Sequence, residues 1–481
     1  EFLNRLCHVH KIGEGFGRDR IHNKDVSMSA GDANNGRIER LTAWIADATG
    51  SPVERIFRRP GGGRNEAWDV EFADGRDKLF LRLDIGTPQP YEKYTLRREA
   101  EIYSALFKAG VPVPEVIAVH PEMEAVLLGY VEGVAPLAKL PVEQQHSIID
   151  SFVPAIAKMH AIDPATMHLP TLAPVSSIKD HVSRELDMWE MRLNYFDRPF
   201  PFLQACLRWM RDNNPDVPGM PSLVQGDTGP GNFLHDGNKL TAIVDFELAH
   251  IGDPLEDLAW IGTRNAQEPV PDYDRLVAQY EQLSGIKVDP FRLKYHMLFA
   301  EWRIGVLGAG NRSHKASAAH DVGAQLIFGG GLHMRLTCEA MAAALGIDLG
   351  EWTLFEADET FGTSVFDAVL TQMKDIVVPN IPDAFASSRA KGISRALKYL
   401  REVERFGDRP LRSELNDISE LIGNKCVDVE QGRRDLQNAV LAGKLDAADL
   451  LKYEWNRVCW NHTLVGGAMG VLATRHLPKV K

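Results

Sequence analysis

The hydrophobic pattern changes twice along the chain and divides it into three regions. In the first region, short alternating or apolar runs predict strands at 53–57, 67–72, 78–83, 113–119 and 125–130. Asp74-Gly75 separates two of these runs and favours a tight hairpin turn. Helical spacing is predicted at 38–45 and 96–106. We therefore expect a small lobe of mixed strands and helices over residues 37–131.

Helical periodicity dominates the second and third regions. Residues 132–345 predict a mainly helical lobe, interrupted by strand-like runs at 232–235 and 240–245. An acidic, weakly patterned stretch predicts a linker over 346–362, and every periodic run over 363–481 is helical. The fold class is therefore α+β, with a two-lobed part followed by an all-α accessory domain.

Two further expectations concern the N-terminal segment and the C-terminal region. Residues 1–36 lack apolar periodicity, so we expect a disordered leader. Met28 is interpreted as the natural start, and the residues before it as a cloning or translation artefact. The apolar faces of 366–377 and 455–472 exceed what a small bundle can hide, so we expect 363–481 to pack on the preceding lobe or form a homodimer.

Composition narrows the class of protein. The chain has 481 residues with 54 Lys and Arg against 66 Asp and Glu, which gives a formal net charge of -12. This balance disfavours binding to nucleic acid or to an anionic membrane by non-specific charge. The five cysteines lack CxxC spacing, which disfavours a disulfide framework or structural zinc. Apolar runs are far shorter than the ~20 residues that span a bilayer, so a soluble cytoplasmic protein is expected.

The main candidate for chemistry is a loop rich in Gly and Pro, followed by an apolar strand. Asp227 and Asn232 lie on the loop, and Asp245 follows the strand. Phosphoryl transfer needs a carboxylate that orients the attacking hydroxyl, together with an amide and a second carboxylate that hold Mg²⁺. An Asp-x4-Asn pair alone is a weak signal, because turns use Asp and Asn for local backbone reasons.

Further elements of a phosphotransferase site precede this loop in the required order. A glycine-rich turn lies between two predicted strands and contains Gly61, Gly62, Gly63, Arg64 and Asn65. Arg82 occupies the next strand and Glu99 the following helix, where a phosphate-binding cation and its acidic partner are required. Each element alone fits an ordinary hairpin, surface arginine or solvated helix face. Their joint order favours phosphoryl transfer.

These motifs resemble the aminoglycoside-phosphotransferase-like family of small-molecule kinases, which share the protein-kinase fold. The resemblance covers about 56–345 and rests above all on Gln-Gly-Asp-Thr-Gly-Pro-Gly-Asn-Phe and Val-Asp-Phe-Glu-Leu-Ala-His-Ile-Gly-Asp-Pro-Leu-Glu-Asp-Leu-Ala. It implies ATP and Mg²⁺ as cofactors, Asp227 as catalytic base, Asn232 and Asp245 as metal ligands, and Arg82 with Glu99 at the phosphates. It also implies that the backbone of Gly129 and Val131 pairs with adenine. Asp253 and Asp257 are expected to order the loop.

Two positions depart from the family pattern. Gln225 replaces the usual His before Gly226-Asp227, and Arg82 replaces the usual Lys. Glutamine can still donate and accept hydrogen bonds, so it can brace the loop. Arginine keeps the charge but binds phosphate with a different, bidentate geometry. The intact set of Asp227, Asn232 and Asp245 favours an active enzyme.

The acceptor remains open at this level. The segment 188–202 combines aromatic side chains with Arg192 and Arg198, which fits either core packing or a pocket for an apolar or anionic acceptor. Arg303 and residues 311–315 are a second basic group that could meet phosphates. The layout resembles the branch of the family associated with acyl-CoA dehydrogenases, which implies a hydroxyacyl-CoA or a related carboxylate-bearing metabolite as the acceptor. The alternatives are an antibiotic (aminoglycoside or macrolide) or apolar-alcohol kinase, and a nucleotide-binding regulatory pseudokinase.

Overall fold

A computed structural model describes residues 30–480, apart from 60–64, 85–93, 314–320 and 352. The chain divides into two compact units, Glu1–Ser51 and Pro52–Lys481. In the first unit the described element is the helix α2, Ala30–Thr49. Part of the segment expected to be a disordered leader is thus helical, because helical hydrogen bonding extends ahead of the amphipathic turns at 38–45. Residues 1–29, including Met28, lie outside the described residues.

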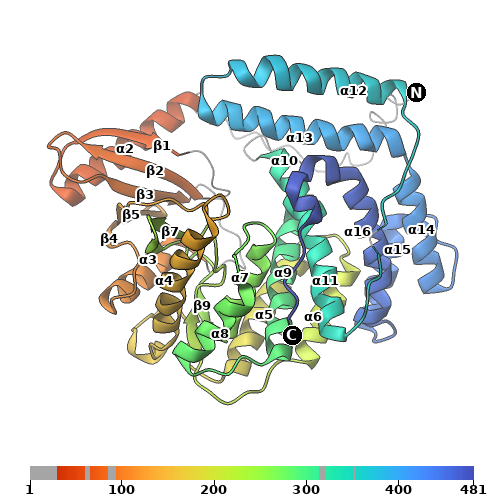
Figure 1. The fold of residues 1–481 in the computed structure, drawn as a ribbon, viewed down its shortest axis with the longest axis horizontal. Coiled ribbons are helices and arrows are strands. Elements are labelled where there is room, and N and C mark those ends of the chain that lie inside the picture. The colour runs from red at the N-terminus through yellow and green to blue at the C-terminus, as the bar shows by residue number, and fades with distance from the viewer. Residues whose placement is uncertain (1–29, 60–64, 85–93, 314–320, 352, 481) are drawn as a thin grey trace, which may run out of the picture. The chain divides into compact units, whose positions relative to one another are not determined.

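The second unit begins with a five-stranded antiparallel sheet in the order β1-β2-β3-β5-β4 (Figure 1). The strands are β1 (Val53–Arg58), β2 (Asn65–Phe72), β3 (Leu79–Asp84), β4 (Val116–Val119) and β5 (Ala125–Gly129). The predicted turn joins β2 to β3, and Gly75 has a φ of 75°, a conformation that glycine adopts without strain. Arg82 lies opposite Ala67 on β2 and Val126 on β5, so a charged side chain projects from the centre of the sheet.

One helix, α3 (Leu96–Lys108), packs beside this sheet. Thr95 caps its first turn by accepting a hydrogen bond from the Arg98 amide. Ile102, Tyr103 and Leu106 are buried in an apolar cluster that also includes Phe152 and Leu258 of the helical lobe. The core therefore runs from the sheet lobe into the helical lobe without interruption.

The helical lobe contains α4 (Val142–His160), α5 (Ile178–Tyr195), α6 (Pro201–Asp212), α7 (Leu255–Asn265), α8 (Tyr273–Ser284), α9 (Pro290–Ser313) and α11 (His333–Leu345). Two small ladders lie among them: β6 (Ser222–Val224) with β9 (His250–Gly252), and β7 (Phe233–Asp236) with β8 (Lys239–Ile243). The loops that connect these strands carry Asp227, Asn232 and Asp245. The predicted α+β, two-lobed fold class is confirmed.

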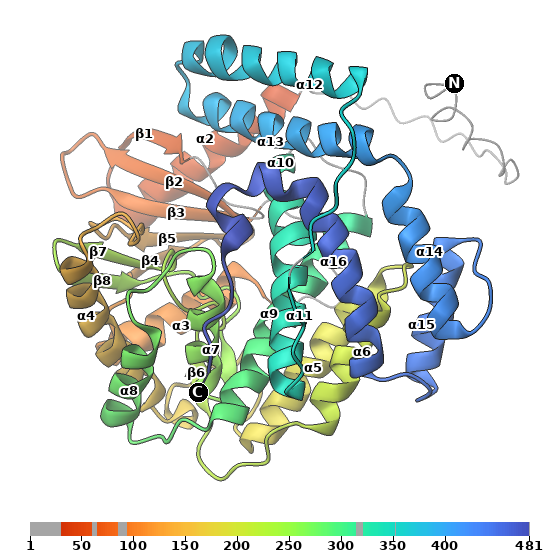
Figure 2. The same cartoon turned by 45° about the vertical axis from the view of Figure 1, so that its right-hand side comes forward.

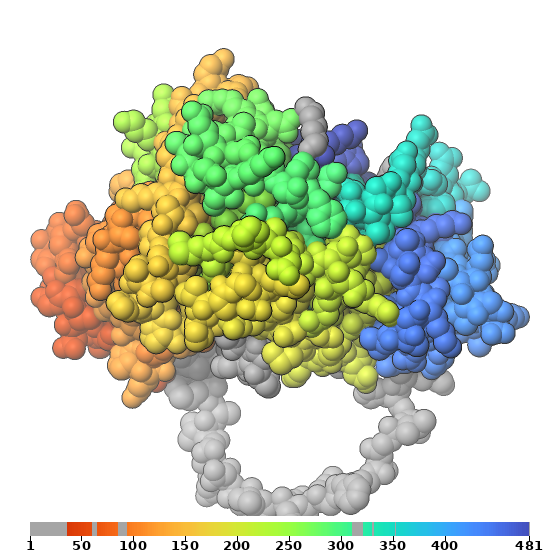
Figure 3. All heavy atoms as spheres, turned by 90° about the horizontal axis from the view of Figure 1, so that it is seen from below, coloured from red at the N-terminus to blue at the C-terminus, as the bar shows by residue number. Residues whose placement is uncertain are grey.

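The C-terminal region is helical, as predicted, and packs on the helical lobe. It follows α10 (Val322–Gln325) and the π-helix η2 (Leu326–Leu332), and contains α12 (Phe361–Gln372), η3 (Met373–Val377), α13 (Ala384–Phe406), α14 (Arg409–Ile422), α15 (Val429–Leu441) and α16 (Ala447–Met469). Leu436 and Leu450 share one buried cluster with Leu203 and Trp302. In Figure 3 the yellow and green surface of the helical lobe meets the blue C-terminal helices directly.

Two sequence interpretations are decided by burial. Trp189 and Phe202 are 0% and 1% exposed and belong to the shared core, so core packing explains these members of the aromatic segment. Tyr195, at 51%, is exposed. Arg303 is fully buried between the Trp260 and Phe299 rings and pairs with Glu256. The suggestion that Arg303 could meet the phosphates of a ligand is therefore wrong. The side chains of 311–315 lie outside the described residues.

Among the described residues, no helix is long and apolar enough to cross a bilayer.

Candidate active site

A cavity of about 250 Å³ lies between the sheet lobe and the helical lobe. Ala67, Phe80, Leu128 and Leu234 give it apolar walls, while Asn65, Arg82 and Asp245 make one end polar. Gly129 and Val131 line the wall, as the sequence predicts for the strand that connects the lobes. The Gly129 amide donates to the Glu115 carbonyl at 2.8 Å, so that amide is not the group that would meet a base. An apolar slot with one charged end suits a nucleotide.

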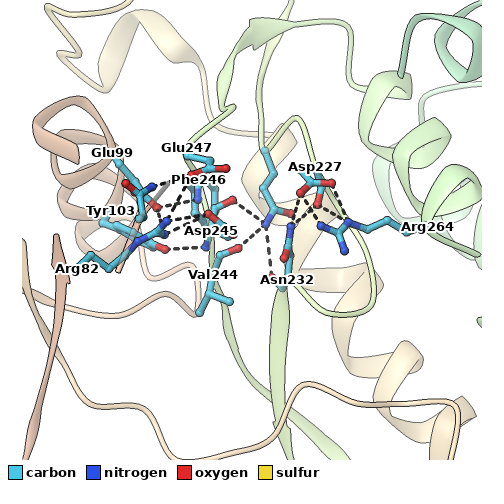
Figure 4. Close-up of polar contacts among 12 residues, drawn as sticks. Arg82, Glu99, Tyr103, Asp227, Asn232, Val244, Asp245, Phe246, Glu247 and Arg264 are labelled. Carbon is cyan, nitrogen blue, oxygen red and sulfur yellow. Dashed lines mark hydrogen bonds and ion pairs between the residues drawn. The ribbon is translucent and has the colours of Figure 1, made fainter. Parts of the chain in front are cut away.

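Arg82 and Glu99 meet at the polar end of this cavity, as their order in the sequence predicts (Figure 4). Arg82 Nη1 lies 2.7 Å from Glu99 Oε1, and its two terminal nitrogens lie 3.1 Å from Asp245 Oδ1. Burial alone would lower the pKa of Arg82, but Glu99 and Asp245 raise it well above its usual value. The guanidinium therefore stays charged where phosphates would enter.

Asp245 is held in an unusual backbone conformation. Its φ is 67°, in the left-handed region that few residues other than glycine adopt. The Asp245 amide donates to the Tyr103 hydroxyl at 2.8 Å, and the Phe246 amide donates to Glu99 Oε1 at 2.9 Å. Both contacts come from α3, so the position of that helix fixes the orientation of the Asp245 carboxylate.

Negative charge exceeds positive charge at this end of the cavity. Glu247 lies 3.5 Å from Arg82 and accepts a 2.8 Å hydrogen bond from Asn65, so one guanidinium faces three carboxylates. The charge of Asp245 raises the pKa of Glu247 to about 8. Burial raises the pKa of Glu99 above its usual value, although Arg82 opposes that shift. A site with this imbalance favours an additional cation.

The loop after β6 brings Asp227, Asn232 and Arg264 together. Arg264 Nε donates to Asp227 Oδ1 at 2.8 Å and its Nη2 to Oδ2 at 2.5 Å, a bidentate ion pair. Asn232 Nδ2 donates to the Asp227 carbonyl and to Oδ2, both at 2.8 Å. Gly229 makes this approach possible: its φ is 136°, and a Cβ there would lie 3.1 Å from the Arg264 Cδ.

Gln225 and Asp257 hold the loop from behind. Gln225 Nε2 donates to the Val244 carbonyl at 2.6 Å, and the Val244 amide donates to the Asn232 carbonyl at 3.0 Å. Asp257 accepts the amides of Gln225 and Gly226, both at 2.9 Å, and also contacts His160. Glutamine therefore joins the Asp227 loop to the segment that carries Asp245, which is the bracing interaction expected for this position.

Asp253 and Asp257 order the loop, as expected from the sequence. Asp253 accepts from the Leu255 amide at the start of α7 and pairs with Arg292 and His296. Although burial would raise its pKa, His296 and Arg292 hold the pKa of Asp253 well below its usual value. Neither carboxylate lines the cavity.

The structure thus gathers most of the predicted site residues. Asn65, Arg82, Glu99 and Asp245 surround the polar end of the cavity, and Asn232 and Asp227 lie on the adjoining loop. Gly61, Gly62, Gly63 and Arg64 lie outside the described residues. Sequence reasoning missed Arg264, Tyr103 and Glu247. Glu247 stands two residues after Asp245, so a search for carboxylates near that motif would have found it, whereas Arg264 gave no such signal.

The donor set fits a magnesium ion brought in with a nucleotide. The described residues contain no cluster of three or more His, Cys, Asp or Glu side chains arranged as a complete metal cage. Mg²⁺ is usually held by one or two carboxylates and completed by phosphates and water. Asn232 directs its Nδ2 to Asp227, and Asp245 receives Arg82 through Oδ1. Within the described residues, Asn232 Oδ1 and Asp245 Oδ2 are left to bind a cation.

Known proteins share parts of this chain. Over 232 residues it is 24% identical to acyl-CoA dehydrogenase family member 10 of Mus musculus, covering 46% of this chain but only 21% of that protein. A macrolide 2′-phosphotransferase from Brachybacterium faecium, solved as the apoenzyme, aligns with a TM-score of 0.43 and 18% identity, covering 60% of this chain and 98% of that one. A thermostable mutant of an aminoglycoside phosphotransferase, solved with ADP and hygromycin B, gives 0.40 and 16%, covering 56% and 92%.

The profile of the phosphotransferase enzyme family matches residues 56–294. This range begins in β1 and ends in α9, and it contains the cavity, the Arg82–Glu99 pair and the loops of Asp227 and Asp245. Residues 56–294, just under half of the chain, therefore match the phosphotransferase enzyme family.

Proposed function

We propose that this protein transfers the γ-phosphoryl group of ATP, with Mg²⁺, to a hydroxyl of a hydroxyacyl-CoA or a related carboxylate-bearing metabolite. The observation that carries the proposal is the arrangement of Asp227. Its carboxylate is fixed by Arg264 and Asn232 beside the charged end of a nucleotide-sized cavity. An ordered carboxylate next to a phosphate site is what hydroxyl activation requires.

Asp227 would orient the acceptor hydroxyl and take its proton. Among the described contacts, Oδ1 accepts only from Arg264 Nε, so one lone pair remains for the hydroxyl. The hydroxyl oxygen forms a bond to the γ-phosphorus as the bond from that phosphorus to the bridging oxygen of ADP breaks. Because this transition state is loose, alignment of the hydroxyl matters more than strong basicity.

The remaining residues act on the nucleotide. Arg82 would contact its phosphates, and Glu99 would keep the guanidinium in place. Asn232 and Asp245 would hold Mg²⁺, which when bound neutralises charge on the β- and γ-phosphates. Phe80 and Leu128 would flank the base, with Val131 as the backbone partner. The presence of each of these groups speaks against the regulatory pseudokinase reading.

The acceptor class is supported by the relatives. The matched protein from Mus musculus is named as an acyl-CoA dehydrogenase family member, and this chain spans about a fifth of its length. That name points to thioester metabolism. The acidic residues near Asp245 are compatible with either class of acceptor. Antibiotics are therefore assayed beside the thioesters.

The test is ADP release from the full chain with ATP and Mg²⁺ over an acceptor panel. The panel pairs 3-hydroxyacyl-CoA and 4-hydroxyacyl-CoA thioesters with the matching free acids, an aminoglycoside and a macrolide. Asp227→Asn serves as the control for background ATP hydrolysis. We expect Asp227-dependent ADP release and a phosphorylated product with a thioester. Turnover only with an antibiotic, or equal ADP release from Asp227→Asn, would overturn the proposal.

A further inference from the structure

The helix α13 carries the largest cluster of basic side chains in the C-terminal region. Its 23 residues include six Lys or Arg and two Glu. The two halves of the helix differ in whether their basic side chains pair with carboxylates. In the second half, Arg401 contacts Glu359, Asp367 and Glu402, and Arg405 contacts Glu359 and Glu402. These arginines hold the linker and α12 against α13.

The first half contains a basic stripe, defined here as Lys391, Arg395 and Lys398. Their spacing of four and three residues places them on one face of the helix. All three are exposed. Within the described part of the chain none forms an ion pair with a carboxylate, and Lys398 Nζ donates to the Gly467 carbonyl at 3.1 Å. One carboxylate, that of Asp321, lies against Gly392 between these basic residues, so the stripe keeps an excess of positive charge.

A contact in its first turn places the start of α13 beside the end of β1. In its first turn the Phe385 ring lies 5.6 Å from the guanidinium carbon of Arg58, the last residue of β1. The next residue along the chain, Arg59, lines the cavity. Figures 1 and 2 both show α13 running from the sheet lobe across to α16.

The stripe faces elements that continue to Asp227. A Cβ on Gly323 of α10 would collide with the Gly392 carbonyl and lie 2.8 Å from the Arg395 Cβ. From α10 the chain passes through η2 to His333, whose Nε2 lies 3.0 Å from Gln267 Nε2. Gln267 stands three residues after Arg264, which holds Asp227. Through α10, η2 and Gln267 the stripe is thus connected to the helix whose Arg264 holds Asp227.

We propose that the basic stripe receives the phosphate groups of a phosphate-bearing acceptor, the adenosine 3′-phosphate 5′-diphosphate end of a CoA thioester. This inference rests on the proposed function for the class of acceptor. It assigns to the C-terminal region a part in substrate recognition.

Charge balance explains why such a surface is needed. The interior of the site carries Glu99, Asp227, Asp245 and Glu247 against the two arginines Arg82 and Arg264, and the chain as a whole has a formal charge of -12. A polyanionic acceptor would be repelled by both. A local positive stripe at the flank offsets this repulsion and orients the acceptor so that its uncharged, hydroxyl-bearing end points inward.

The test measures binding directly, by calorimetry on the full chain with CoA, 3′-dephospho-CoA and pantetheine. The stripe variant is Lys391→Glu with Arg395→Glu. The matched control is Lys425→Glu with Lys452→Glu, which makes the same charge change at exposed positions of the C-terminal region. We expect affinity to fall in the order CoA, dephospho-CoA, pantetheine. The stripe variant should weaken CoA binding about tenfold, less at high salt, and leave pantetheine unchanged.

Each outcome decides a separate claim. Equal CoA affinity in the stripe variant and the wild type, or no preference of the wild type for CoA over pantetheine, overturns the inference. The neutral pair Lys391→Gln with Arg395→Gln should give an intermediate loss, which checks that charge rather than misfolding is responsible. If the stripe variant phosphorylates a hydroxyacyl-CoA with an unchanged KM, the proposed function stands and the role of the stripe in binding CoA is rejected. If CoA binding depends on the stripe but no hydroxyacyl-CoA is phosphorylated, the binding role of the stripe stands and the proposed function is rejected.

Discussion

Two arginines organise the two halves of the site, and they face opposite charge balances. Arg82 lies among three carboxylates, those of Glu99, Asp245 and Glu247, whereas Arg264 makes a bidentate pair with Asp227 alone. The first half is electrically incomplete and favours a further cation. The second half is balanced, so its arginine fixes a carboxylate in place. The comparison separates a charge-binding half from a positioning half.

The largest effect is expected in the balanced half, from Asp227→Asn. The amide cannot accept the hydroxyl proton, so turnover should fall by about 10² to 10⁴. Nucleotide affinity should stay within about twofold, because Asp227 does not line the cavity. Single-turnover kinetics and ADP titration measure the two quantities. Wild-type turnover in this variant would show that Asp227 is not the base.

In the incomplete half, Asp245→Asn removes a carboxylate that we assign to the cation. The Mg²⁺ concentration for half-maximal activity should rise about tenfold or more, because one charged ligand becomes neutral. Magnesium titration at saturating ATP measures it, with Asp236→Asn at the exposed end of β7 as the control. Superimposable curves for Asp245→Asn and the wild type would contradict the metal role.

Arg264→Lys sharpens the contrast between the halves. Lysine keeps the charge but cannot reproduce the paired bonds to both Asp227 oxygens. We expect turnover to fall about tenfold while the KM for ATP and the magnesium curve remain unchanged. If only the magnesium dependence changed, Arg264 would act on the cation as the residues around Arg82 do, and the two halves of the site would not differ in role.

The Arg82–Glu99 pair predicts coupling rather than a large loss. Removing either side chain leaves the other charge buried, so the KM for ATP should rise in each single variant, Arg82→Gln and Glu99→Gln. The double variant should show a coupling energy on the order of 1 kcal/mol. Additive effects would mean that the contact does not matter in solution. Arg82→Lys should retain measurable activity.

The smallest effect is expected from Glu247→Gln. This change removes one of the crowded carboxylates while an amide oxygen can still accept from Asn65. Without nucleotide or Mg²⁺ the variant should be equally stable or more stable, by up to about 1 kcal/mol. Thermal unfolding measures the difference. If the variant unfolded at a clearly lower temperature than the wild type, the Glu247 carboxylate would be stabilising, and its crowding by Glu99 and Asp245 would not be unfavourable.

The parts of this site that could be predicted are those whose order along the chain reflects local structure. Arg82 on a strand and Glu99 on the next helix had to face each other once the strand and helix packed. Asp227 and Asn232 share one loop, so their contact needed no tertiary information. Arg264 was missed because it reaches Asp227 across 37 residues of sequence, and its place near the end of a helix that is buried over residues 255–263 carried no distinguishing pattern.

Burial explains the other failures of prediction. Periodicity marks which side chains share a face of α5, but the same face suits a packed core or a pocket. Trp189 turned out to be core, and Arg303 serves as a buried partner of Glu256. Trp189 shares its cluster with residues of α9 and of the C-terminal helices, whereas the partner of Arg303 lies on α7. Both sets of contacts come from parts of the chain that are distant in sequence.

The core shared by α6 and α16 also limits how such a gene can change. A fusion or exchange that cut between 345 and 363 would divide a packed interior, since Leu203, Leu207 and Trp302 pack in the same cluster as Leu450 and Leu451. The recipient would inherit an exposed apolar surface on the catalytic part. We therefore expect the C-terminal helices to be inherited together with the phosphotransferase domain, as one unit of descent rather than as an exchangeable cassette.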